Sequence, residues 1–227
     1  GDDTAAVIIT PLGHPLAAVM EEPKPGFLEA VKELAHKYNA VLIFDEIRTG
    51  FRVSIGGAQK HYGVTPDLAV FGKAMANGYP IGAVTGKAEI MKEGEANVFI
   101  SSTFFPNSLS FVAALKTIEI LERDNVLDKI WEKGTYFNNK VQELIDKYNI
   151  GARITGIAPM MFITFDKDAN KTYKAKRTEF YTQLIRRNVF LQPFHHGYIC
   201  YRHTQEDLDY TLNAIEESFA YVKEKYQ

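Results

Sequence analysis

The sequence has little cysteine, no long hydrophobic run and almost no net charge, and each absence excludes a class of protein. Cys200 is the single cysteine among 227 residues. An internal disulfide is therefore impossible, and we expect a reducing, cytoplasmic compartment with this thiol in the core. No apolar stretch approaches the ~20 residues that a membrane-spanning helix needs. The formal net charge of −2 provides no field for a nucleic acid or a membrane surface, so we expect neither as a partner.

Three short apolar runs predict strands that are buried on both faces of a parallel sheet. They are AAVII (5–9), AVLIF (40–44) and LAVFG (68–72), and unbroken runs of branched residues are typical of such strands. Between the first two lies FLEAVKELAHKY (27–38), whose apolar residues recur at helical spacing. A strand, a helix and a strand in this order predict a right-handed βαβ unit.

The rest of the sequence predicts two long helices followed by a small α+β domain. The helices are expected at about 109–122 and 126–148. After Gly151, we expect strands in ARIT, MMFITF, VFLQP and YICYR, and helices in AKRTEFYTQLIRR and in the closing EDLDYTLNAIEESFAYVKEKY. The predicted fold class is therefore α/β. Residues 1–124 would form part of a large domain with a mainly parallel sheet, and residues 125–227 a connecting helix and a small C-terminal α+β domain.

Ionisable residues directly follow two of the predicted strands. VLIF runs into Asp45 and Glu46, and LAVFG runs into Lys73. In open α/β sheets, ligands bind beyond the carboxyl ends of the strands, so an acid and a lysine at that edge could face one ligand. An ordinary ion pair at the edge of the sheet explains the same pattern equally well. The spacing alone leaves both interpretations open.

Three motifs around these residues favour the ligand site. IFDEIRTGFR (43–52), GGAQKHYGVTPDLAVFGKAMANGYPIGA (56–83) and SSTFFPNSLS (101–110) strongly resemble the class III aminotransferases, which are fold type I enzymes that use pyridoxal 5'-phosphate (PLP). The nearest resemblance is to the glutamate-1-semialdehyde 2,1-aminomutase branch, and it covers nearly the whole chain. Members of this family are about twice as long, so the resemblance implies that the chain is the C-terminal half of such an enzyme.

The resemblance implies a role for each of five residues. Lys73 would form the Schiff base with PLP and would then move a proton as a general base. Asp45 would lie beside the pyridine nitrogen and favour its protonated form, which keeps the ring a strong electron sink. Ile47 would pack on the ring, and Ser102 and Thr103 would contact the cofactor phosphate near the start of a helix.

Structural alternatives stay open for several of these residues. Ser102 and Thr103 could be turn and capping residues only, and Ile47 could be an ordinary core residue. In the family, the threonine contact crosses a subunit interface, so the resemblance also implies a homodimer. We expect no metal site at His195 and His196, because adjacent side chains of a strand point to opposite faces and no carboxylate pair accompanies them. A loop is favoured here.

Two features of the motifs bear on the reaction. Thr10-Pro11 stands where many relatives carry Glu-Pro, and AMANGYPIGA (74–83) is closer to general transaminases than to aminomutases. The resemblance therefore implies amino transfer from a small-molecule amine donor to a carbonyl acceptor, with intramolecular transfer by an aminomutase as the alternative. An inactive truncated fragment is a further alternative. We expect the isolated chain to bind PLP weakly, because the other half of the site would be missing.

Overall fold

The chain folds into two compact units. The computed structural model describes residues 1, 3–14, 19–101 and 103–226. Unit 1 comprises Gly1–Leu12 and Pro23–Leu127, and unit 2 comprises Gly13–Glu22 and Asp128–Gln227. Among the described helices, none combines the length and the apolar character that crossing a bilayer requires. The assignment of residues 1–124 and 125–227 to two domains of an intact enzyme stays a prediction.

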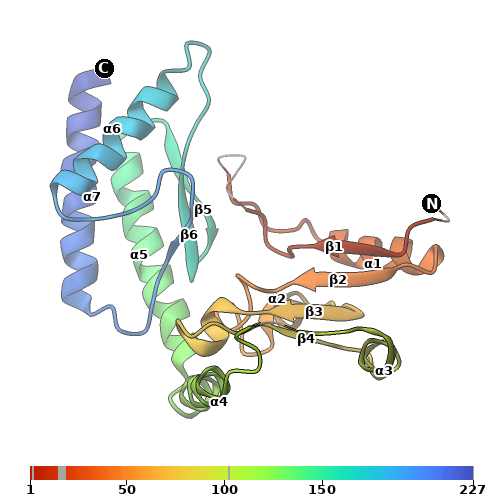
Figure 1. The fold of residues 1–227 in the computed structure, drawn as a ribbon. Coiled ribbons are helices and arrows are strands. Elements are labelled where there is room, and N and C mark those ends of the chain that lie inside the picture. The colour runs from red at the N-terminus through yellow and green to blue at the C-terminus, as the bar shows by residue number, and fades with distance from the viewer. Residues whose placement is uncertain (2, 15–18, 102, 227) are drawn as a thin grey trace. The chain divides into compact units, whose positions relative to one another are not determined.

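Unit 1 is built on a four-stranded sheet with the strand order β1-β2-β3-β4 (Figure 1). The strands are β1 (Ala6–Ile9), β2 (Val41–Asp45), β3 (Leu68–Phe71) and β4 (Ala83–Gly86). The first three pair in parallel, and β4 runs antiparallel to β3. This arrangement confirms the predicted α/β fold with a mainly parallel sheet. Strand β4 was not predicted, because its residues AVTG form no apolar run.

The strands are less buried than the apolar runs suggest. Strand β1 lies at the edge of the sheet, and its Ile8 is 64% exposed. In β2, Leu42 and Phe44 are fully buried, whereas the alternate residues are only half-buried. The expectation of strands buried on both faces is therefore wrong. The buried face of β2 packs against Leu28 and Ala35 of the first helix.

Helices and one 3₁₀ turn connect and cover the strands of unit 1. They are α1 (Phe27–Lys37), α2 (Gly57–Tyr62), the 3₁₀ helix η2 (Lys73–Ala76), α3 (Ala88–Asn97) and α4 (Ser108–Arg123). Helix α4 begins after Asn107, whose side chain accepts the backbone N–H groups of Leu109 (3.0 Å) and Ser110 (3.4 Å). Ala114 of α4 packs on Met75 in η2. The long helix predicted here is therefore present, and it supports the segment that starts at Lys73.

Unit 2 contains an antiparallel sheet and three helices. The strands are β5 (Ala152–Ile157), β6 (Met160–Phe165) and β7 (Gly197–Tyr198), and the helices are α5 (Val126–Tyr148), which begins at the end of unit 1, α6 (Thr172–Arg186) and α7 (Gln205–Tyr226). Helices α6 and α7 pack on each other (Figure 1). Phe180 and Phe219 stack between them, with ring centroids 4.7 Å apart.

Three expectations for unit 2 are wrong. The VFLQP segment (189–193) is a loop, and YICYR contributes only Tyr198 to a strand. Pro193 lacks the N–H group that a strand ladder needs, and the chain turns at this residue. Cys200 is exposed instead of lying in the core. The buried position beside it belongs to Ile199.

Candidate cofactor site at the ends of two parallel strands

The ends of β2 and β3 define a possible binding site. Asp45, the last residue of β2, pairs with Val70 of β3 in the parallel register. The next backbone N–H, that of Glu46, donates to the Val70 carbonyl at 2.9 Å. Lys73 follows Val70 by three residues, a distance of about 10 Å at ~3.3 Å per residue along a strand. The carboxylate and the lysine thus belong to the same edge of one sheet.

The half-buried Asp45 side chain is held by the turn that follows it. Its Oδ1 accepts the backbone N–H of Ile47 at 3.0 Å. The Ile47 side chain extends toward Gly72. Its Cγ2 lies only 3.8 Å from the position that a Cβ atom would occupy if residue 72 had a side chain. The turn after β2 and the residue before Lys73 are therefore neighbours. A larger residue at Gly72 would also come within 3.3 Å of the Ile81 carbonyl oxygen.

Lys73 begins the 3₁₀ helix η2 with an unusual backbone conformation. Its φ angle is 44°, in the left-handed region that residues other than glycine rarely adopt. The side chain is exposed, whereas Met75 and Ala76 of the same turn are buried. The Met75 N–H donates to the Gly72 carbonyl at 3.0 Å. These contacts anchor the turn on its apolar side and leave the lysine amine accessible to a ligand.

Glu46 is a fully buried carboxylate directly beside this site. It accepts a hydrogen bond from the Thr49 hydroxyl and the backbone N–H groups of Ala58 and Gln59, the last two at 2.8 Å each. A Cβ on Gly57 would lie 2.6 Å from Oε1 of this carboxylate. Glu46 therefore ties the turn after β2 to the start of α2. Its partners were not predictable, because the main-chain donors lie 12 and 13 positions later.

Of the two residues predicted to contact a phosphate, the structure describes only Thr103. Thr103 lies in an exposed turn five residues before α4 begins. Ser102 falls outside the residues that the structure describes. The hydrogen bonds and packing described above bring together Asp45, Ile47 and the Lys73 turn, and they do not extend to Thr103. The phosphate contacts of Ser102 and Thr103 stay predictions.

Solved structures of known enzymes share this fold. The chain superposes on the FumI protein of Sphingopyxis sp. MTA144, solved with PLP, with a TM-score of 0.91 and 25% identity over 99% of this chain and 53% of that one. It superposes on an omega-transaminase from Sphaerobacter thermophilus with a TM-score of 0.85 and 26% identity, over 96% of this chain and 52% of that one. The fold is that of PLP-dependent transaminases.

The chain belongs to the class III aminotransferase family, whose model matches residues 1–218. It is 60% identical to a 3-aminobutyryl-CoA aminotransferase from Cloacimonas acidaminovorans, over 98% of this chain and 54% of the relative. It is 36% identical to a glutamate-1-semialdehyde 2,1-aminomutase from Methanosphaera stadtmanae, over 95% of this chain and 53% of the relative. The resemblance inferred from the motifs is therefore confirmed. The chain spans about half the length of these curated relatives.

The cofactor that the family indicates is PLP, and the residues at the sheet edge fit it. A carboxylate beside the pyridine nitrogen and a lysine amine at the aldehyde are the groups that tune and hold this cofactor. Asp45 and Lys73 place a carboxylate and an amine at the ends of neighbouring strands, and the apolar Ile47 side chain lies close to Gly72. Members of the family act on small-molecule amines and carbonyl compounds.

Proposed function

We propose that the protein containing this chain is a PLP-dependent aminotransferase in which Lys73 holds the cofactor. The parallel register that sets Asp45 opposite Val70, three residues before Lys73, carries this proposal. When bound, PLP supplies an electron sink for the negative charge that develops on the substrate carbon. Lys73 would remove the proton from that carbon and return it. The Asp45 carboxylate would favour the protonated form of the ring nitrogen.

Ile47, Ser102 and Thr103 would complete the contacts that this chain makes to the cofactor. Ile47 is half-buried and lies against Gly72, which suits packing on one face of a planar ring. The first N–H groups of α4 are already capped by Asn107. The hydroxyls of Ser102 and Thr103, which precede this cap, would therefore be the groups that reach the phosphate.

Chemical reduction of the imine between PLP and the Lys73 amine tests this proposal. The 227-residue chain is incubated with PLP, reduced with borohydride and mapped by mass spectrometry. Borohydride makes even a weakly populated imine permanent, so we expect a pyridoxyl adduct at Lys73 that is lost in Lys73→Ala. Lys92 is an exposed lysine of α3, and Lys92→Ala should leave the labelling of Lys73 unchanged. Equal labelling of Lys73 and surface lysines would overturn the assignment.

We further propose a 3-aminoacyl thioester as the amine donor. The support is the 60% identity to a relative named for 3-aminobutyryl-CoA, compared with 36% to an aminomutase. The protein should convert 3-aminobutyryl-CoA in the presence of a 2-oxo acid acceptor. Conversion of glutamate-1-semialdehyde without any acceptor would instead identify an aminomutase.

We propose that the protein forms a homodimer through α4. Leu109, Val112 and Leu115 recur at helical spacing on α4, and each is between 64% and 71% exposed. The preceding segment exposes Phe99 and Phe104 as well. Soluble monomers rarely expose contiguous apolar surface of this kind. A second copy of the chain would cover it.

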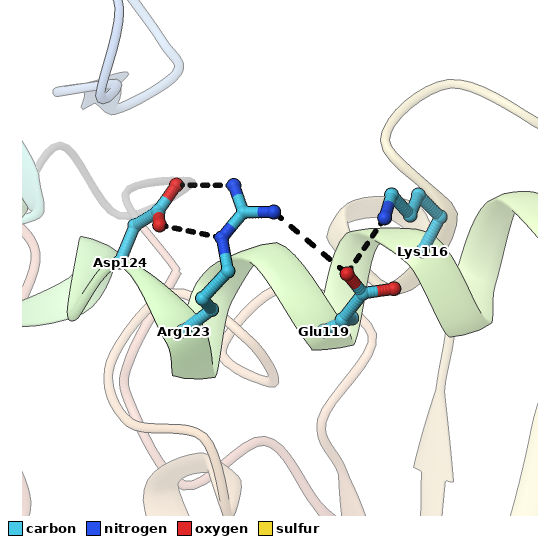
Figure 2. A network of polar contacts seen from close by, with 4 residues as sticks. All are labelled: Lys116, Glu119, Arg123 and Asp124. Carbon is cyan, nitrogen blue, oxygen red and sulfur yellow. Dashed lines mark hydrogen bonds and ion pairs between the residues drawn. The ribbon is translucent and has the colours of Figure 1, made fainter.

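The far end of α4 is polar and provides a matched control. Figure 2 shows Glu119 between Lys116, at 2.6 Å, and Arg123, which also pairs with Asp124 at 2.7 Å. Leu115→Glu should convert a dimer into monomers in sedimentation velocity, because it would bury a charge in the interface. Lys116→Glu, which places a carboxylate one residue further along on the helix, should leave the dimer intact. A monomeric unaltered protein would overturn the proposal.

We also propose a cytoplasmic location and small-molecule partners only. The single thiol, Cys200, is exposed, and a reducing compartment would protect it from oxidation. The net charge of −2 offers no attraction to nucleic acids or anionic membranes. Localisation of the tagged protein in intact and fractionated cells tests this assignment.

A further inference from the structure

Three histidines from distant parts of the sequence converge within unit 2. His195 and His196 lie in the loop before β7, and His14 lies in the segment Gly13–Glu22. One ring nitrogen from each histidine lies within 4.8 Å of the other two. The rings of His195 and His196 are stacked, with centroids 4.3 Å apart and 23° between their planes. His14 meets these rings edge-on, at 5.6 and 5.8 Å.

This geometry removes one reason for expecting no metal here. That expectation rested on the lack of an accompanying carboxylate pair and on a strand, in which His195 and His196 would point to opposite faces, although a loop was favoured. The loop conformation instead turns both rings to the same side, where they stack. The sequence gives no signal for His14, because nothing near it connects it to residues so much later in the chain.

We propose that His14, His195 and His196 bind a divalent transition-metal ion such as Zn²⁺. Imidazole nitrogens are common ligands of zinc, nickel and copper. Ligand nitrogens of a tetrahedral zinc site lie about 3.3 Å apart, given Zn–N bonds of ~2.0–2.1 Å. The ligand nitrogens would therefore close by about 1.5 Å at most on binding. The stacked rings of His195 and His196 would also have to rotate, because a bound ion lies in the plane of each imidazole that holds it. Three histidines leave the fourth position to a water molecule.

Hydrogen bonds to neighbouring groups occupy one ring nitrogen in two of the three histidines. Nδ1 of His195 hydrogen-bonds the backbone oxygen of His196 at 2.9 Å, which makes Nε2 the ligating nitrogen of His195. Nε2 of His196 hydrogen-bonds the Tyr198 hydroxyl at 2.5 Å, so Nδ1 would be its ligand atom. The His196 ring is also buried, with 3% of the residue exposed. Both rings are thus held by contacts outside the metal position.

The surroundings provide both an anchor and an access route. The segment that carries His14 is fastened to β5, because the Gly156 N–H donates to the Met20 carbonyl at 2.9 Å and the Met20 N–H to the Thr155 hydroxyl at 3.3 Å. His195 and His196 also line a cavity of about 780 Å³ in unit 2. This cavity gives an ion and its water a path to the cluster. A bound ion would cross-link the segment Gly13–Glu22 to the loop before β7.

Metal titration of the chelator-treated 227-residue chain, without added PLP, tests the site. Calorimetry with Zn²⁺ and visible absorption with Co²⁺ should each give one ion per chain. His14→Ala and His195→Ala should each weaken binding by at least about 100-fold, and Tyr198→Phe by about 10-fold. His195→Gln keeps an amide that can donate to the His196 carbonyl but lacks a good ligand, so it should lose binding while the fold is retained.

Two control variants separate this site from adventitious binding. His203→Ala removes a histidine of the same unit whose Nδ1 accepts the Cys200 N–H at 3.3 Å, and Cys200→Ser removes the exposed thiol. Both should bind one ion with unchanged affinity, and circular dichroism should show every variant folded. Loss of binding in either control, or unchanged binding in folded His14→Ala and His195→Gln, would overturn the proposal. So would the absence of saturable binding to the unaltered chain.

Discussion

Asp45 lies directly opposite Val70 in the parallel ladder between β2 and β3. The same strand buries Leu42 and Phe44 under α1, so Asp45 points to the other face of the sheet. A shift of one residue in this register would exchange the two faces and send the carboxylate into the core. The apolar pattern of β2 therefore positions the acid. The proposed placement of a ring between Asp45 and Lys73 depends on both strands ending at the same edge.

The charge of Asp45 should control protonation of a bound cofactor. In Asp45→Asn, the pyridine nitrogen of ¹⁵N-labelled PLP should shift toward its deprotonated resonance, because the neighbouring negative charge is gone. We expect PLP binding to persist and turnover by the intact enzyme to fall by about 100-fold. Asp45→Glu, which keeps the charge, should retain the protonated resonance. A protonated signal in Asp45→Asn would show that Asp45 does not face the ring nitrogen.

Removing the charge of Glu46 should destabilise the turn beside the site. Gln at this position presents an amide N–H₂ to the N–H donors of Ala58 and Gln59, which leaves a buried donor unsatisfied. Glu46→Gln should lower the free energy of unfolding by about 2 kcal/mol in urea titration. Glu122→Gln changes an exposed carboxylate of α4 and should have no measurable effect. Equal stability of the two variants would contradict the role assigned to Glu46.

Asp67, just before β3, joins three elements of unit 1. Its carboxylate contacts Lys87 at 2.7 Å and His36 at 2.9 Å, and it accepts the Leu42 N–H at 2.8 Å. Burial alone would raise the pKa of Asp67, but the hydrogen bonds from Lys87, Leu42 and His36 outweigh it and lower the pKa from 3.8 to about 2. The folded state therefore stabilises the charged form of the Asp67 carboxylate more than the unfolded state does.

The lowered pKa of Asp67 predicts a loss of stability in acid. As the pH falls, the Asp67 carboxylate takes up a proton in the unfolded chain before it does so in the folded chain. The stability that the charged carboxylate contributes is therefore present in full above pH 3.8 and disappears as the pH falls toward about 2. It amounts to about 2 kcal/mol. In urea titrations between pH 2 and 5, Asp67→Asn should show a smaller pH dependence than the unaltered chain. Glu33→Gln, an exposed carboxylate of α1, should keep the original slope.

Two helical glycines should respond to alanine with opposite signs. A Cβ on Gly134 of α5 would lie 2.1 Å from the Ala158 carbonyl oxygen, whereas one on Gly94 of α3 would meet nothing within 4 Å. Gly134→Ala should therefore destabilise the chain by about 3 kcal/mol through overpacking. Gly94→Ala should stabilise it by about 0.5 kcal/mol, because alanine favours the helix. Thermal unfolding of both variants measures the difference, and a stable Gly134→Ala would contradict the close contact between α5 and the turn after β5.

Local patterns in the sequence were sufficient for the fold class, and they predicted Asp45 and Lys73 as site residues. Unbroken apolar runs predicted the parallel strands, and the residues at their ends placed Asp45 and Lys73 at one edge. The motifs around them identified the family. These features were readable because strand periodicity, strand ends and short motifs depend on neighbours in the sequence.

Only the tertiary structure decided which distant residues meet. It joined His14 to His195 and His196, gave Glu46 its main-chain partners in α2, and left Cys200 exposed beside a buried Ile199. None of these features follows from the periodicity of the sequence. The side chains lie in loops, where no repeating pattern sets their direction, and their partners come from remote segments. Pairing between remote segments depends on how the whole chain fills its core, and a local pattern does not carry that information.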